Sequence, residues 1–212
     1  MGRTDARIAM IDAAEAIVAE QGLAAMSLRE VGVRAGQLNK TAPQYHFGDR
    51  AGLIAAVVET RMAPIDAARG RLLAELDATP SVSVRGLVAA LICPLAEAVA
   101  SRPGSRYARF LVQATFDPVL SSIVDEHVRA GSALDVMNRL TGCTGLEENL
   151  ESSRLQSLWA TAVTTLARWE ASPELFADPA LLPDLVDTAT AALMAPLCQH
   201  DSSDQPGRPY SA

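Results

Sequence analysis

The feature of this sequence that most constrains its fold is the spacing of its apolar residues, which follows the period of an α-helix. In the segment 5–21, Met10, Ala14, Ile17 and Val18 fall on one helical face, and Gly22 follows as a stop. Hydrophobic residues make up 49% of the chain but aromatic residues only 4%, a balance that favours helices packed through aliphatic ridges over β-sheets. The sequence therefore predicts an all-α fold.

Capping residues, glycines and prolines divide this pattern into about nine helices. Gly22 ends the first, a capping box of Ser27 and Glu30 begins a short second helix, and Gly36 ends that one. A short third helix ends near Phe47. We expect the others over residues 49–77, 83–100, 105–116, 117–140, 147–171 and 178–198, followed by a disordered tail over 200–212.

Polar side chains suit the starts of several of these helices. Asn39 or Thr41 can cap the third, and Asp49 the fourth. A second capping box, of Thr144 and Glu147, is predicted for the helix over 147–171.

The formal net charge of −7 is unevenly distributed along the chain. Residues 1–53 hold six Lys or Arg and six Asp or Glu, so the acidic excess lies in residues 54–212. A neutral first segment permits DNA binding without predicting it.

Several classes of protein find no support in the sequence. The N-terminus is too polar for a signal peptide, and no apolar run reaches the ~20 residues of a membrane span, so we expect a cytoplasmic protein without membrane contact. Cys93, Cys143 and Cys198 lie far apart and are expected to be buried, reduced thiols. Because metal-ligand spacing, a phosphate-binding glycine loop and a Ser, His and Asp cluster are lacking, we predict no enzyme activity, cofactor or metal.

The first three helices have the dimensions of a helix-turn-helix, in which the third helix enters the major groove of DNA. The run from Ala35 to Leu53, AGQLNKTAPQYHFGDRAGL, resembles the TetR family of transcriptional regulators. Family members carry Ala-Gly at the turn, an aromatic-His-Phe sequence late in the recognition helix and a Leu in the following helix. The resemblance covers about the first 55 residues. It implies a helix-turn-helix domain over 1–50 and a larger helical domain for ligand binding and dimerisation over 51–199.

Nine residues are the predicted DNA contacts. Four polar side chains at the exposed start of the third helix suit base edges and phosphate oxygens, although they also suit a solvated helix start: Asn39, Lys40, Thr41 and Gln44. The resemblance implies that Tyr45 and His46 lie near the sugar-phosphate backbone while Phe47 packs inward. Arg50 can hold a phosphate or pair with a nearby carboxylate. Ser27 and Arg29 complete the predicted set.

For the larger domain, the resemblance implies a small-molecule effector. One interpretation is an apolar cavity bounded by Met62 and Phe110, with Gln113 or His127 orienting the ligand. The alternative is a packed core with a hydrogen-bonded His. Trp159 fits the core or an interface better than a pocket.

Two apolar stripes in the last two helices predict a homodimer built as a four-helix interface. The alternative is that both stripes face the core of the protomer. The predicted interface residues are Leu155, Ala162, Leu166, Trp169, Val186, Ala189 and Leu193.

Taken together, these features predict a homodimeric transcriptional repressor that a small, mostly apolar effector releases from a pseudo-palindromic double-stranded DNA operator; activation is the alternative. The competing classes are a helical enzyme and a helical interaction module whose first three helices serve only for packing. Such a module predicts no salt-dependent DNA binding, whereas a repressor loses affinity steeply as salt rises.

Overall fold

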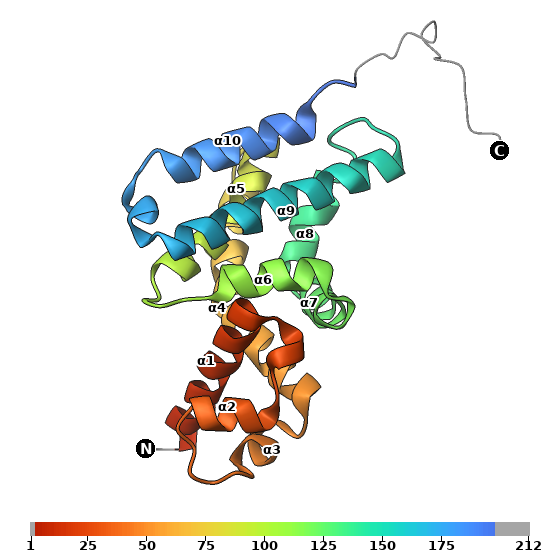
Figure 1. The fold of residues 1–212 in the computed structure, drawn as a ribbon. Helices are drawn as coiled ribbons and strands as arrows, with labels where there is room; N and C mark the ends of the chain where they lie inside the picture. The colour runs from red at the N-terminus through yellow and green to blue at the C-terminus, as the bar shows by residue number, and fades with distance from the viewer. Residues whose placement is uncertain (1–2, 198–212) are drawn as a thin grey trace, which may run out of the picture.

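A computed structural model of the chain describes residues 3–197, and over this range it consists of ten α-helices and two short 3-10 helices (Figure 1). The all-α prediction is confirmed. The predicted tail over 200–212 and Cys198 lie outside the described residues.

The elements follow one another along the chain without strands between residues 3 and 197. They are α1 (Arg3–Gln21), η1 (Leu23–Ala25), α2 (Leu28–Arg34), α3 (Ala42–Phe47), α4 (Arg50–Asp77), α5 (Val84–Ala100), α6 (Tyr107–Phe116), α7 (Pro118–Ala130), α8 (Ser132–Leu140), α9 (Glu148–Ala171), η2 (Pro173–Ala177) and α10 (Leu181–Met194).

The helix expected over 117–140 is two helices, α7 and α8, separated at Gly131. A Cβ at Gly131 would lie 2.7 Å from the Asp66 carboxylate of α4, so glycine permits this close approach. The Ser132 hydroxyl donates a hydrogen bond to the same carboxylate at 2.8 Å. This tertiary contact fixes the break at the start of α8.

Local caps account for most helix starts. Ser27 accepts a hydrogen bond from the Glu30 amide at 3.1 Å, and Asp49 accepts one from the Gly52 amide at 2.8 Å, as predicted. The capping box at Thr144 is wrong. The Thr144 hydroxyl instead donates to the Glu151 carboxylate at 2.7 Å, and the Glu147 side chain makes no cap hydrogen bond.

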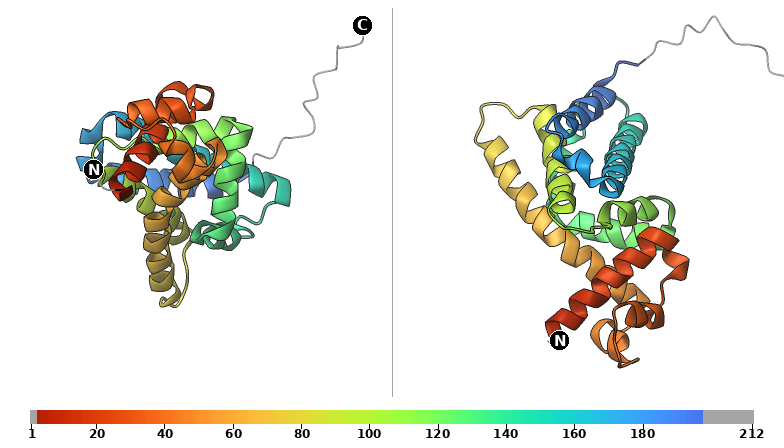
Figure 2. Two further views of the ribbon diagram at one scale, coloured as in Figure 1. Left: turned by 90° about the horizontal axis from the view of Figure 1, so that it is seen from below. Right: turned by 60° about the vertical axis from the view of Figure 1, so that its left-hand side comes forward.

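The helices form a small head, α1 to α3, at one end and a larger body at the other (Figure 1). The long helix α4 runs from the head along one side of the body, while α9 and α10 lie side by side at the far end (Figure 2). Helix α6 lies between these parts and packs against both α1 and α9. A single apolar core continues from Val18 in the head to Leu166 in α9.

In the described part of the chain, no helix has the length and apolar character to cross a membrane. Within the same residues, no group of three or more His, Cys, Asp or Glu could hold a metal ion. Cys93 and Cys143 are half-buried rather than buried, because Cys93 occupies a partly exposed face of α5 and Cys143 a loop.

Candidate functional site: a nucleic-acid interface and an apolar cavity

The turn between α2 and α3 depends on a close approach of the two helices. A Cβ at Gly32 would lie 3.1 Å from Cγ of Pro43, tighter than an ordinary contact. Pro43 is buried in the first turn of α3, where the amide that it lacks has no helical partner. Gly36 takes a φ of 66°, and the Gln37 amide donates to the Gly32 carbonyl at 2.9 Å. The result is a short α3 held firmly across α2.

The predicted base-reading residues lie around the start of α3. Lys40, Thr41 and Gln44 are exposed. Asn39 is exposed as well, but its side-chain oxygen accepts hydrogen bonds from the Thr41 amide at 3.0 Å and the Thr41 hydroxyl at 2.8 Å. Asn39 therefore shapes the loop that leads into α3, and Thr41 makes no side-chain cap.

The aromatic-His-Phe run separates into outward and inward side chains. Tyr45 is exposed, and its ring meets the half-buried His46 ring edge-on at 5.4 Å between centroids. Phe47 is buried, with the guanidinium of Arg7 5.5 Å above its ring centroid. The inward packing expected for Phe47 is confirmed, and DNA contact by Tyr45 and His46 stays a prediction.

The three remaining predicted DNA contacts differ in exposure and in the hydrogen bonds that their side chains already make. Arg29 is exposed, whereas Ser27 is engaged as the cap of α2. Arg50 donates a hydrogen bond to the main-chain oxygen of Leu23 and so connects the start of α4 to η1. Its partner is a carbonyl group and not the carboxylate that the sequence had suggested as one alternative. Leu38, which was not among the predicted contacts, is fully exposed in the turn before α3.

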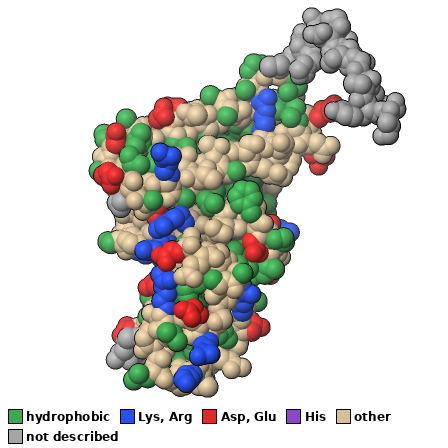
Figure 3. All heavy atoms as spheres, in the orientation of Figure 1, with side chains coloured by type: hydrophobic (Ala, Val, Ile, Leu, Met, Phe, Trp, Pro, Cys, Tyr) green, Lys and Arg blue, Asp and Glu red, His purple; other side chains and the backbone are tan. Residues whose placement is uncertain are grey.

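The surface of the head carries both signs of charge. Figure 3 shows Lys and Arg side chains at the end formed by α2 and α3, with acidic side chains nearby. Part of this charge is paired, since Arg34 contacts Glu20 of α1 at 2.8 Å. Lys40 extends from the exposed loop before α3.

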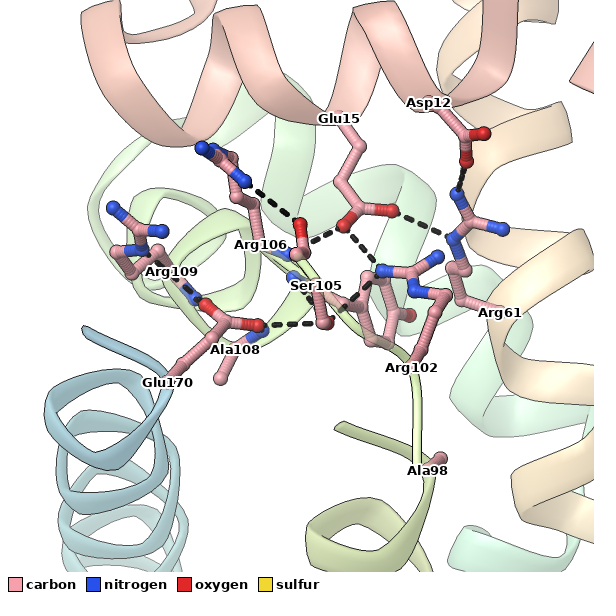
Figure 4. Close-up of polar contacts among 12 residues, drawn as sticks. Asp12, Glu15, Arg61, Ala98, Arg102, Ser105, Arg106, Ala108, Arg109 and Glu170 are labelled. Carbon is pink, nitrogen blue, oxygen red and sulfur yellow. Dashed lines mark hydrogen bonds and ion pairs between the residues drawn. The ribbon is translucent and has the colours of Figure 1, made fainter. Parts of the chain in front are cut away.

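A buried carboxylate holds the head to the body. Glu15 of α1 is 3% exposed and lies between Arg61, Arg102 and Arg106 (Figure 4). It accepts from Nε of Arg61 at 2.6 Å, from the Arg102 guanidinium and from the Arg106 main-chain amide at 2.8 Å. In the sequence, Glu15 lies outside the apolar face that Met10, Ala14, Ile17 and Val18 form on the first helix. Its burial reflects arginines of α4 and the α5–α6 loop that the helical pattern alone does not reveal.

The same loop is tied to α9 by a second buried carboxylate. Glu170 accepts from the Ser105 hydroxyl at 2.8 Å and from the amides of Ala108 and Arg109, both at 3.1 Å (Figure 4). These amides lie in the first turn of α6, where a carboxylate suits the helix dipole. A continuous chain of polar contacts thus connects α1 to α9 through Arg102 and Ser105.

An apolar cavity of about 210 Å³ lies in the body between α4, α5, α7, α8 and α9. Its polar lining residues are Asp125, Gln156 and Arg69, and the Arg69 guanidinium side chain is the buried one, in a residue that is 1% exposed. This guanidinium donates to Asp66 at 2.7 Å and to the Ala90 carbonyl at 3.2 Å. Burial lowers the pKa of Arg69, against the opposing effect of Asp66. Most of the remaining wall is apolar: Met62, Leu91, Val124, Val128, Ala133, Met137, Leu155 and Trp159.

The predicted ligand-binding set agrees with this cavity in part. Met62 lines it, but Phe110 is completely buried and stacks on Tyr107 at 5.8 Å between ring centroids. Gln113 lies by Gly22 at the head, and the half-buried His127 is outside the wall. These three residues do not line this cavity. The face of α6 that carries Phe110 and Gln113 packs against α1 and α9, and α7 presents Val124 and Val128 to the cavity in place of His127.

Trp159 and Arg69 are cavity residues that sequence analysis missed. Trp159 was assigned to a core or an interface. Arg69 could have been noticed as a charge within the apolar stripe of α4, four residues after Ile65 and four before Leu73.

The two stripes assigned to a dimer interface are buried inside the protomer. All seven predicted side chains, from Leu155 to Leu193, are 7% exposed or less in the single chain. They pack where α9 and α10 meet each other and where they meet α5 and α6. The physical cause is that α5 and α6 already cover the apolar faces of α9 and α10 within the protomer.

Comparisons with solved structures find the same overall fold in other proteins. No family model and no curated protein matches the chain. The transcriptional regulator FadR from Bacillus subtilis, solved in complex with stearoyl-CoA, has a TM-score of 0.59 and 15% identity, covering 89% of this chain and 97% of that one. The fatty acid degradation regulator FadR from Bacillus halodurans has a TM-score of 0.56 and 14% identity, covering 91% and 96%.

A third solved structure with this fold is NalD, the secondary repressor of the MexAB-OprM multidrug efflux pump in Pseudomonas aeruginosa. It has a TM-score of 0.54 and 20% identity, covering 91% of this chain and 97% of that one. At such identities the likeness shows a shared fold, and this fold extends over nearly the full length of all three regulators.

Proposed function

We propose that the protein is a DNA-binding transcriptional regulator of the TetR type, and that it represses transcription. The observation that carries the proposal is the short helix α3, braced by α2 through Gly32 and Pro43, with Lys40 exposed in the loop before it and Gln44 exposed in its first turn. A short helix mounted in this way suits entry into the major groove. Leu38, exposed beside it, can contact a thymine methyl group or a sugar.

A homodimer supplies the second reading helix. The outer face of α9 carries small or polar exposed residues at helical spacing, Ser153, Ser157, Thr161 and Thr164, and α10 exposes Ala191 and Ala192. Small side chains allow two helix pairs to approach closely across a two-fold axis. Such a dimer binds a pseudo-palindrome whose half-sites lie about one helical turn of DNA apart.

The effector of this regulator is a mostly apolar small molecule bound in the cavity beside Trp159 and Arg69. A drug-sized ligand needs roughly 300 Å³ or more, so binding has to widen the present space of about 210 Å³. Widening requires that α7 and α8, which contribute Val124, Val128, Ala133 and Met137 to the wall, move relative to α4 and α9. A ligand that favours the widened state shifts the protein toward it by its difference in affinity for the two states.

The polar contacts that connect α1 to α9 can transmit the change between the two states of the cavity to the head. Movement of the α5–α6 loop changes the position of Arg102, which holds Glu15, and of Ser105, which holds Glu170. The orientation of α1 and of the reading helix then depends on the state of the body.

The test is selection of DNA from a random pool by the purified full chain at low salt, followed by gel shift. We expect a pseudo-palindromic sequence and an affinity that falls steeply with salt. Lys40→Ala should weaken all duplexes and reduce the salt slope by about one. The control Arg71→Ala removes an exposed positive charge from the body part of α4 and should leave the slope unchanged. Absence of sequence preference, or equal losses in both variants, would contradict the proposal and favour a packing role for the head.

A further inference from the structure

A second cavity, of about 240 Å³, lies beside the contact that holds α1 to the body. It is formed by α4, the end of α5 and the loop that leads into α6. Unlike the cavity at Trp159, its wall is rich in hydrogen-bonding side chains: Thr60, Arg61, Ser101, Arg102, Ser105 and Tyr107.

Two buried donors in this wall lack a hydrogen-bond partner among the described residues. They are the hydroxyl of Tyr107 and Nη1 of Arg102. Tyr107 is 2% exposed, and burial raises its pKa far above the ordinary value, so its hydroxyl keeps its proton and can donate. Folded proteins pair nearly all such buried groups, because an unpaired donor loses its hydration without replacement. Two unpaired donors in one cavity therefore point to a ligand that accepts hydrogen bonds.

The charges around the cavity favour an anionic acceptor. Arg61 and Arg102 share the single carboxylate of Glu15, and the second partner of Arg61, Asp12, is an exposed side chain. Arg102 uses Nη2 for Glu15 and Ser105, which leaves Nη1 free for another contact. A planar guanidinium with a free donor matches the geometry of an oxyanion.

We propose that this cavity binds a small organic carboxylate, whose oxygens accept hydrogen bonds from Nη1 of Arg102 and the hydroxyl of Tyr107. The short apolar part of the ligand lies against Ile65 and Val99, which complete the wall. Because the cavity is smaller than the roughly 300–1,000 Å³ of drug-sized sites, the ligand has only a few carbon atoms. This site is separate from the proposed effector cavity, since the two cavities have no lining residue in common.

Isothermal titration of the full chain with butanoate tests the proposal, with neutral butanamide and inorganic phosphate as parallel arms. We expect saturable binding of one butanoate per chain and at least tenfold weaker binding of butanamide, which has no charge to pair with Arg102. Phosphate should bind more weakly than butanoate, because it gains nothing from the apolar wall. Equal affinity for butanoate and butanamide, or no saturable butanoate binding, would overturn the anion site. Tighter phosphate binding would overturn the carboxylate assignment.

Tyr107→Phe is the informative variant because it removes the unpartnered hydroxyl and keeps the ring that stacks on Phe110. It should weaken butanoate binding about fivefold, the value of one hydrogen bond, without lowering the melting temperature of the free protein. The matched control Arg139→Gln removes an arginine paired with Asp77 on the surface of the body and should bind butanoate like the unaltered chain. Unchanged binding by Tyr107→Phe, or an equal loss in Arg139→Gln, would show that the cavity is not the binding site.

Discussion

Replacing Gly52 with alanine has two opposing effects on stability at the junction of α3 and α4: a gain from helix propensity and a loss from steric overlap. Gly52 is the third residue of α4, and its amide donates to the Asp49 cap. Alanine is favoured over glycine in a helix by about 1 kcal/mol, so propensity alone predicts stabilisation. However, a Cβ at this position would lie 2.2 Å from the main-chain oxygen of Phe47 at the end of α3.

This overlap determines whether Gly52→Ala stabilises or destabilises the folded protein. Contacts of a Cβ below 3.0 Å essentially do not occur, and the obstacle is backbone, so α3 has to shift relative to α4. Forced backbone shifts of this kind cost about 1–3 kcal/mol, and an approach of 2.2 Å to a main-chain oxygen belongs to the upper part of that range, about 2–3 kcal/mol. Subtracting the gain in propensity of about 1 kcal/mol leaves a net loss of about 1–2 kcal/mol. For a chain of this size, the melting temperature should fall by roughly 2–8 °C.

Gly70→Ala is the matched control, since Gly70 lies in the same helix with nothing within 4 Å of its added Cβ. It should raise the melting temperature by about 1–4 °C through propensity alone. Thermal unfolding followed by far-UV circular dichroism measures both variants. If Gly52→Ala raises the melting temperature as much as Gly70→Ala does, the close packing of α3 on α4 is refuted. A displaced α3 should also reduce affinity for the selected DNA more than affinity for unrelated DNA.

Three further predictions concern the reading helix, the dimer and the response to acid. Gln44→Ala should relax base preference at one position of the selected DNA, costing about 1–3 kcal/mol there, and a uniform loss at all positions would argue against base contact. Thr161→Arg should give folded monomers in sedimentation, because Thr161 is on the outer face of α9, whereas its neighbour Ala162→Arg should unfold the chain, because Ala162 is buried in the protomer. An intact dimer of Thr161→Arg would place the interface elsewhere. The pKa of Glu151 is lowered below its usual 4.5, first by the Thr144 hydroxyl, so its stabilising contribution is complete above that pH and is lost as the pH falls through the lowered pKa. Glu151→Gln should therefore lower the melting temperature at neutral pH, and this difference should shrink below about pH 4; a difference independent of pH would contradict the assignment.

Much of the secondary structure could be predicted from the sequence because it depends on contacts between near neighbours. Ser27 and Asp49 cap helices through amides three residues away, and Asp117 does so within three residues. Gly22 and Gly36 end helices because they take positive φ angles that other residues disfavour. The position of the candidate reading helix followed from these signals, together with a family resemblance confined to the first 55 residues.

Buried polar groups could not be predicted in this way. Glu15 has the spacing of a solvated residue on α1, but its partners Arg61 and Arg102 lie 46 and 87 residues further along the chain. The cavity at Arg69 likewise depends on how α4, α7 and α9 meet, which no single helical pattern contains.

The sequence by itself determined which face of each late helix is apolar, and the tertiary structure decided what covers that face. The stripes through Leu166 in α9 and Val186 in α10 were visible as helical periodicity, and both are buried as a hydrophobic stripe should be. A period of 3.6 residues carries no information about whether the cover is the same chain or a second copy. Here α5 and α6 cover these stripes, because the tertiary fold packs α9 and α10 against them within one chain.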